Sequence, residues 1–219
     1  IRVTKYVDGL AEMPEKRSYS VIMQPTKEKN VWSVIGNTLK TSCVTVMVDE
    51  ATGKICFSDV AGNVLLREGD VAEVTPILEG VDKGNYSISQ VFSLDADEAI
   101  YGLGQRRSPK LNQRGESIDI WNGNANITIP YIASDKGYGL YWDNAGRSRF
   151  EDTPQKTTFS SEVAQGVDYY FFYDDGTQDG VIAAIRQLTG QATMFPLWTM
   201  GHWQCRERYK TSDELCEVI

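Results

Sequence analysis

The sequence predicts a mainly β protein built as an antiparallel β-sandwich, and three observations lead to this prediction. Short β-branched and aromatic runs recur up to about residue 174, separated by Gly, Pro, Asn and Asp. The first helical pattern begins only after that point. Strands this numerous without intervening helices are expected to form two packed sheets, because one open sheet would leave an apolar face in water.

The candidate strands follow one another along the chain. The clearest of them form a three-stranded meander at residues 39–48, 54–58 and 64–67, joined by turns rich in Asp, Gly and Asn. Further strands are predicted at 2–7, 19–23, 31–35, 86–94, 118–121, 138–142, 156–163 and 169–173.

One helix is predicted after the last of these strands. Asp175 or Thr177 can cap its first turn, and Gly190 is placed to end it. The apolar residues that fall on one of its faces are Val181, Ile182, Ile185 and Leu188. We therefore expect this helix to cover one flank of the sandwich.

Residues 191–219 follow a different pattern. Pro196 precedes an apolar run of strand length at 197–203, and a polar loop comes next. Thr211, with Glu214 three residues later, fits a capping box that opens a helix. A strand, a loop and a helix make one βα unit, which cannot bury its apolar faces alone. We therefore expect the chain to be the front piece of a larger protein.

The charge of the chain argues against several classes of partner. The net charge is −8, the isoelectric point is near 4.8, and no Lys/Arg run exceeds Arg106-Arg107. Neither nucleic acid nor an anionic lipid surface is an expected partner, since both need a basic surface. No apolar run reaches the 18 or so residues of a membrane span.

The cysteines, the histidine and one glycine pair predict structure rather than chemistry. The four cysteines lack CxxC spacing, so we expect buried or half-buried thiols, and a disulfide bridge between Cys43 and Cys56 stays open. His202 is expected to be packed in a strand. Gly102 and Gly104 lack the third glycine of a phosphate-binding loop, which favours tight backbone packing.

Several separate motifs occur in a fixed order along residues 99–219. They are YGLGQ at 101–105, SIDIWN at 117–122, IPYIAS and KGYGLYWDN within 129–144, GVDYYFF at 166–172, DGVIAAIRQLTGQ at 179–191 and MFPLWTMGHWQCRERYKTSDEL at 194–215. Their order and separations resemble the front of a glycoside hydrolase family 31 enzyme. Within that family the resemblance is strongest to bacterial α-xylosidases, with α-glucosidases close behind.

The resemblance implies a galactose-mutarotase-like β-sandwich over residues 1–190. Residues 191–219 would be a linker and the first βα unit of a (β/α)₈ barrel, with 197–203 as its first strand. Such a barrel needs about 250 residues, far more than the stretch from Pro196 provides.

The family performs retaining hydrolysis of α-linked sugars with two carboxylates. The resemblance places both on later barrel strands, so residues 1–219 are expected to hold neither and to be inactive alone. No cofactor and no metal are expected for this reaction. The expected partner of the full-length enzyme is an α-linked oligosaccharide that contains xylose or glucose.

The resemblance singles out two residues of the sandwich. Asp119 lies in the segment that reaches over the barrel mouth in the family, where a carboxylate can accept hydrogen bonds from two sugar hydroxyls. Trp121 could stack on a sugar face. The alternatives are that Asp119 merely points outward from an exposed strand, and that Trp121 packs in the core.

A second set, Arg206, Glu207 and Tyr209, follows the predicted first barrel strand. The C-terminal ends of barrel strands carry the active sites of such enzymes, so these residues are substrate-binding candidates. Glu207 departs from the family, which often shows an aromatic residue there. The alternative for all three is a salt-bridged surface loop.

A different class of function also fits the residues. The chain could be a free-standing carbohydrate-binding β-sandwich module without hydrolase activity. The tail argues against this, because an independent module gains nothing from an apolar strand and half a helix. We also expect the apolar tail residues Trp198, Trp203, Leu215 and Val218 to be disordered, folded back on the sandwich, or paired with another copy of the chain.

Overall fold

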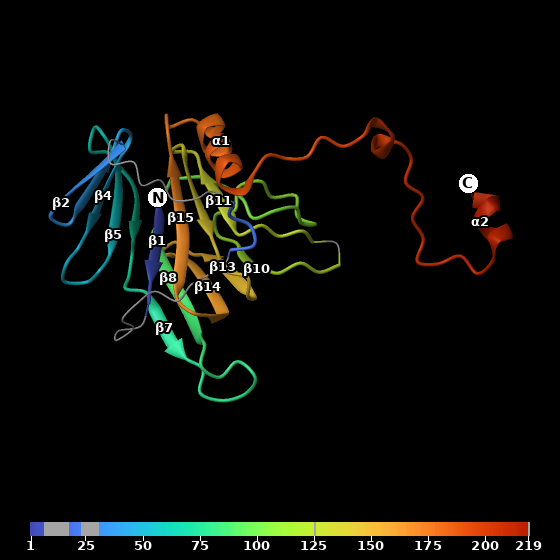
Figure 1. The fold of residues 1–219 in the computed structure, drawn as a ribbon, viewed down its shortest axis with the longest axis horizontal. Coiled ribbons are helices and arrows are strands. Elements are labelled where there is room, and N and C mark those ends of the chain that lie inside the picture. Colours follow the sequence, from blue (N-terminus) through green and yellow to red (C-terminus); the bar gives the residue numbers. More distant parts are fainter. Residues whose placement is uncertain (7–17, 23–30, 125, 219) are drawn as a thin grey trace.

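The computed structural model describes residues 1–6, 18–22, 31–124 and 126–218, and two antiparallel sheets make up its body (Figure 1). This confirms the predicted β-sandwich. The five-stranded sheet runs in the order β1 (Arg2–Lys5), β15 (Val167–Tyr173), β12 (Tyr138–Trp142), β11 (Tyr131–Ser134) and β9 (Ile100–Gly102). The ten-stranded sheet runs in the order β10 (Ser117–Ile120), β13 (Ser148–Asp152), β14 (Thr157–Ala164), β8 (Tyr86–Ser93), β6 (Val64–Glu68), β5 (Ile55–Asp59), β4 (Val44–Val48), β3 (Thr38–Thr41) and β2 (Trp32–Ile35), and β7 (Glu73–Pro76) also pairs with β8.

Aromatic side chains fill the space between the two sheets. Phe57 of β5 stacks on Phe171 of β15 with ring centroids 4.1 Å apart. Trp142 of β12 stacks on Phe159 of β14 at 5.6 Å. All four rings are buried, so these cross-sheet contacts join the layers through large apolar areas.

Strand β1, at the start of the sandwich sequence, lies beside β15, near its end. It pairs with β15, which places Arg2 beside Tyr170 and Lys5 beside Val167. Arg2 also binds the buried Asp168 with both Nε and Nη2, at 3.0 and 2.6 Å, across 166 residues of sequence.

A buried carboxylate connects this strand to the other sheet. Glu68 of β6 accepts hydrogen bonds from Lys5 Nζ at 2.6 Å, from Tyr169 Oη at 2.8 Å and from the amide of Ile55 at 2.7 Å. Burial, with Glu68 beside it, raises the pKa of the Tyr169 hydroxyl well above its usual value. These contacts satisfy the charge of Glu68 inside the protein.

Helix α1 (Gln178–Thr189) packs on the outer face of the five-stranded sheet, against β12 and β15 (Figure 1). Thr177 caps it by accepting the amide of Gly180, and Gly190 ends it with φ 93°, as predicted. Leu188 joins Tyr141, Tyr170 and Phe172 in a second buried cluster. Ile182 was predicted to share the apolar face that covers the sandwich, and this was wrong, because the residue is 51% exposed.

Several predicted strands differ from those observed. The run at 39–48 is two strands, β3 and β4, because the chain turns at Ser42-Cys43. Residues 19–22 form no strand, and Met23 lies outside the described residues, as does Val7 of the first predicted strand. Strands β7, β9, β11 and β13 were not predicted; β9 and β11 are only three and four residues long.

The predicted barrel strand at 197–203 is not formed in this structure. Residues 197–200 form a 3₁₀ helix, η2 (Leu197–Met200), and residues 201–211 carry no strand. A parallel strand needs hydrogen-bonding partners on neighbouring strands, and none of the described strands pairs with this segment. The tail extends away from the sandwich (Figure 1), and Trp198 and Trp203 are 72% and 69% exposed.

The last described residues of the tail form the helix that was predicted after Thr211. Helix α2 (Ser212–Val218) is capped by Thr211, whose hydroxyl accepts the amide of Glu214 at 3.1 Å. The Glu214 carboxylate reaches back to the amide of Lys210 rather than to that of Thr211. Neither described helix is long and apolar enough to cross a membrane.

Two of the four thiols, Cys205 and Cys216, and the histidine depart from expectation. All four cysteines are free, so Cys43 and Cys56 are not bridged. Those two are half-buried, whereas Cys205 and Cys216 are exposed because the tail has no cover. His202 is exposed for the same reason, and its ring lies 3.3 Å from the Gln204 side chain.

Candidate functional site

Asp119 occupies an exposed position on an edge strand. Strand β10 alternates, so that Ile118 and Ile120 are buried while Ser117 and Asp119 face outward. On β13, Arg149 stands opposite Asp119, with Nη1 3.3 Å from Oδ1, and its Nη2 donates to Ser117 Oγ at 2.7 Å. The two charged side chains are 58% and 52% exposed. Such a pair stabilises the fold by no more than about 1 kcal/mol and leaves the carboxylate within reach of a ligand.

Trp121 lies just beyond β10 on the same surface. Its side chain is 50% exposed, so the structure does not place it in the core. The guanidinium of Arg147 lies 4.7 Å from its ring centroid, in cation–π geometry. This contact stabilises the observed orientation of the ring, two residues beyond Asp119 along the chain.

The loop that follows Trp121 is tied to the segment before β10. Gln105 and Ile127 exchange two backbone hydrogen bonds of 2.7 and 2.9 Å. At Gly104, which has φ 82°, a Cβ atom would lie 2.1 Å from the carbonyl oxygen of Ile127. Tight backbone packing therefore explains this glycine, as predicted. Asn122 closes the loop by accepting the amide of Thr128 at 2.7 Å.

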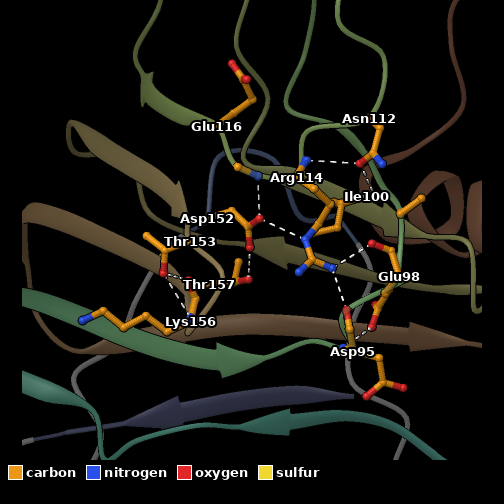
Figure 2. A network of polar contacts seen from close by, with 12 residues as sticks. Asp95, Glu98, Ile100, Asn112, Arg114, Glu116, Asp152, Thr153, Lys156 and Thr157 are labelled. Atoms are coloured by element: carbon orange, nitrogen blue, oxygen red, sulfur yellow. Dashed lines mark hydrogen bonds and ion pairs between the residues drawn. The ribbon is translucent and has the colours of Figure 1, made fainter.

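An ion pair between the half-buried Arg114 and the buried Asp152 fixes the start of β10 (Figure 2). Arg114 Nε lies 2.9 Å from Asp152 Oδ2, and the same oxygen accepts the amide of Gly115 at 2.6 Å. The amide of Asp152 donates to the carbonyl of Glu116 at 2.9 Å, and Thr157 Oγ1 donates to its other carboxylate oxygen. Together these contacts form what we call the Arg114–Asp152 clasp.

The clasp extends into the loop between β8 and β9. Arg114 Nη1 donates to the carbonyls of Asp95 and Glu98, at 2.8 and 2.7 Å (Figure 2). The Glu98 carboxylate is buried and accepts from Ser134 Oγ at 2.6 Å and from the hydroxyl of Tyr138. Burial, with Glu98 beside it, raises the pKa of the Tyr138 hydroxyl well above its usual value. These groups satisfy one another, so we read this cluster as structural.

The second predicted set lies in the tail, and the structure does not bring it to the first (Figure 1). Arg206 Nη1 is 2.7 Å from Glu214 Oε1, and its guanidinium lies 5.4 Å from the centroid of the Tyr209 ring. Gln204 donates to the Tyr209 hydroxyl at 2.8 Å. Glu207 is exposed. This arrangement is that of a solvated, salt-bridged loop.

The sequence reasoning missed the two arginines that orient the candidate site. Arg147 and Arg149 lie in the unpredicted segment RSRFED at 147–152, whose alternation of charged residues with Phe150 is the pattern of a half-buried strand. That alternation could have revealed β13. Among the described residues, no group of three or more His, Cys, Asp or Glu is placed to hold a metal ion.

Comparison with known proteins identifies the family. The family model of the glycosyl hydrolase 31 N-terminal galactose mutarotase-like domain matches residues 1–151, and the chain belongs to glycoside hydrolase family 31. It is 38% identical over 143 residues to an α-xylosidase of Saccharolobus solfataricus, covering 61% of this chain and 19% of that protein. It is 32% identical over 131 residues to α-xylosidase A of Aspergillus niger, covering 59% of this chain and 18% of that protein.

A solved structure resembles nearly the whole chain. It is a family 31 α-xylosidase from a soil metagenome, complexed with xylose, with a TM-score of 0.85 and 26% identity. The similarity covers 99% of this chain and 34% of that one. The chain thus spans about a fifth of the curated relatives and about a third of the solved one.

We predict that Asp152→Ala lowers the free energy of unfolding by about 3 kcal/mol, because it leaves the guanidinium of Arg114 without its buried partner. Urea denaturation followed by circular dichroism measures the change. The matched control is Asp119→Ala, which breaks the exposed ion pair between β10 and β13 and should cost less than about 1 kcal/mol. Equal losses in the two variants would contradict this role for the clasp.

Proposed function

We propose that this chain is the N-terminal part of a retaining α-glycoside hydrolase, an α-xylosidase that acts in carbohydrate metabolism. The observation that carries the proposal is the family match over residues 1–151, together with the two α-xylosidase relatives. In this proposal residues 1–190 are the N-terminal domain, and 191–219 are the linker and first βα unit of the catalytic barrel. The sandwich supports the barrel and shapes its substrate pocket.

Asp119 and Trp121 are the residues that we assign to substrate binding in the sandwich. Their exposure and their fixed orientation by Arg149 and Arg147 support this assignment. An ionised carboxylate accepts two sugar hydroxyls, and the exposed part of an indole ring can pack on the apolar face of a sugar. The ligand is an α-linked oligosaccharide that contains xylose or glucose.

Arg206, Glu207 and Tyr209 are proposed to contact the same substrate from the barrel side. Their place in the motif at 194–215, which resembles the first barrel unit of the family, supports this role, because active sites of such barrels lie at the C-terminal ends of the strands. The salt bridge from Arg206 to Glu214 and the ring of Tyr209 would then have to be rearranged beside the sandwich. The two sets would meet only in the assembled enzyme.

The first prediction from this proposal concerns activity. The 219-residue chain should not hydrolyse 4-nitrophenyl α-xyloside or α-glucoside, because the proposal places both catalytic carboxylates outside residues 1–219. A chromogenic assay of the purified chain measures the rate. Turnover above a buffer blank that disappears with point variants of this chain would refute the proposal that the catalytic carboxylates lie outside residues 1–219.

The second prediction concerns Asp119 in the full-length enzyme. Asp119→Ala should lower kcat/KM for an α-xyloside about tenfold or more, since a hydrogen bond to a charged group is worth roughly 1.5–3 kcal/mol. Its melting temperature should barely change, because the ion pair with Arg149 is exposed. Steady-state kinetics and thermal unfolding together separate the two effects.

Asp143 is the matched control. It is buried, its amide donates to the carbonyl of Asp168 at 3.0 Å, and its carboxylate accepts from Ser18 Oγ at 3.0 Å. Asp143→Ala should therefore cost about 1–3 kcal/mol of stability and leave kcat/KM of the folded enzyme within a factor of two. If both variants behave alike, the assignment of Asp119 to substrate is wrong.

The third prediction concerns self-association through the tail. Trp198 and Trp203 are exposed, and apolar surface left in water contributes about 25 cal/mol per Å² toward association. Removing residues 191–219 should reduce dimer formation of the 219-residue chain in multi-angle light scattering. Equal monomer fractions for both chains at the same concentration would rule out this mode of association.

A further inference from the structure

The outer face of the ten-stranded sheet carries a transverse row of polar side chains that begins at Asp119. The strand register places Asp119 of β10 opposite Arg149 of β13, and Arg149 opposite Ser160 of β14. Ser160 stands opposite Ser89 of β8, which stands opposite Glu73 of β7. The row therefore crosses five strands, which corresponds to about 19 Å at the usual strand spacing.

A second row runs beside the first and begins at Trp121. The ring of Trp121 contacts Arg147, whose Nη1 lies 4.0 Å from Glu162 Oε1 of β14. The row continues on β8 and β7 with Ser87 and Thr75, which stand opposite each other. Both rows consist of outward-facing residues that are exposed or half-buried. We call the two rows together the polar track.

A hollow of about 290 Å³ opens at the far end of this track. Its lining residues come from both rows and their floor, and they are Glu73, Thr75, Ser87, Ile88, Ser89, Ser160, Ser161 and Glu162. Short serines stand between longer charged side chains at the hollow, and the register of β14 on β8 shifts beside it, between Ser161 and Ala164. A bulge of this kind bends the strand and re-aims the side chains beside it.

The chemistry of the track suits a neutral ligand with many hydroxyl groups. Hydroxyls and carboxylates offer donors and acceptors along its length, and Ser89 already donates to Glu73 Oε2 at 3.1 Å. Both arginines face carboxylates, Arg149 at Asp119 and Arg147 at Glu162, so the track presents no unbalanced positive charge to an anion. Trp121 adds a ring face at the near end.

We propose that the polar track binds the distal units of an oligosaccharide whose near end lies at Asp119 and Trp121. This inference rests on the proposed function for the nature of the ligand, and it adds that the substrate is a chain of several sugars. The hollow at Ser89 and Ser160 takes a unit far from the reacting bond. It is a specificity site and contains no catalytic residue.

The test is a titration of the isotopically labelled 219-residue chain, followed by amide chemical shifts. The probes are xylose and glucose as single units, and isomaltopentaose and a xyloglucan heptasaccharide as longer ones. We expect at least one long probe to bind about tenfold or more tightly than the single units, with shifts at residues 73–75, 87–89 and 160–162. Shifts confined to Asp119 and Trp121, or affinity that does not grow with length, would overturn the proposal.

Two variants localise the site. Ser160→Trp fills the hollow and should weaken the long probe at least fivefold, while Ser58→Trp, on β5 of the same sheet but outside the track, should not. Dispersed amide spectra check that each variant folds. If Ser160→Trp does not fold, the paired change Glu73→Gln and Glu162→Gln takes its place with the same expected weakening. Unchanged binding in a folded variant would refute the site.

The two proposals fail in different ways. If the long probes shift the amide resonances of the track while Asp119→Ala leaves the kinetics of the full-length enzyme unchanged, the track proposal is supported and the substrate role of Asp119 is refuted. If Asp119→Ala lowers kcat/KM and the long probes leave the track unshifted, the opposite holds. In the full-length enzyme, Ser160→Trp should raise KM for the long probe at least fivefold relative to the parent enzyme. The short substrate 4-nitrophenyl α-xyloside does not reach the hollow, so any change in its KM should be smaller. If the variant and the parent have the same KM for the long probe, the track proposal is wrong.

Discussion

The position of every outward-facing residue near Asp119 depends on the register between β10 and β13. Strand β10 has four residues and lies at the edge of its sheet, so it has few contacts of its own to hold that register. A slip of one residue would turn Asp119 into the core and Ile118 into water. The Arg114–Asp152 clasp prevents the slip, because Asp152 binds the amide of Gly115 and the carbonyl of Glu116 immediately before the strand. The geometry of the exposed, weakly bonded candidate site thus rests on an ion pair whose carboxylate, Asp152, is buried.

The parts of the fold that could be predicted are those in which local pattern and tertiary environment agree. The alternation at 86–94, the continuous apolar run at 138–142, and the caps of α1 at Thr177 and Gly190 reflect forces that act within a few residues of sequence. The hairpin between β3 and β4 was missed because Ser42-Cys43 carries no glycine or proline to mark a turn. Strand β13 was missed because its outward residues are charged, and its inward Asp152 is polar as well. A buried carboxylate on a strand is explained only by its partner, which lies 38 residues away at Arg114.

In the candidate site, too, some features follow from the local sequence and others depend on tertiary contacts. That Asp119 faces outward follows from the alternation with Ile118 and Ile120, which the sequence displays. That Arg149 binds it, and that Arg147 covers one face of Trp121, depends on a pairing that no local pattern specifies. At 197–203 the local sequence predicts a strand that the structure does not contain. The segment is apolar enough for a strand, but a strand forms only where a neighbouring strand supplies hydrogen-bonding partners. Family resemblance therefore does not specify the secondary structure of a segment that lacks those neighbouring strands.

The pairing of β1 with β15 has a consequence for biosynthesis. The two strands are joined by contacts such as Arg2 to Asp168, which span 166 residues. A ribosome that adds about 5–20 residues per second needs on the order of ten seconds or more between making one strand and the other. During that interval the backbone of β1 has no partner from β15, and its open edge is available to chaperones or to other nascent chains. Emergence of residues 167–173 is therefore the event that gives β1 its partner in the five-stranded sheet.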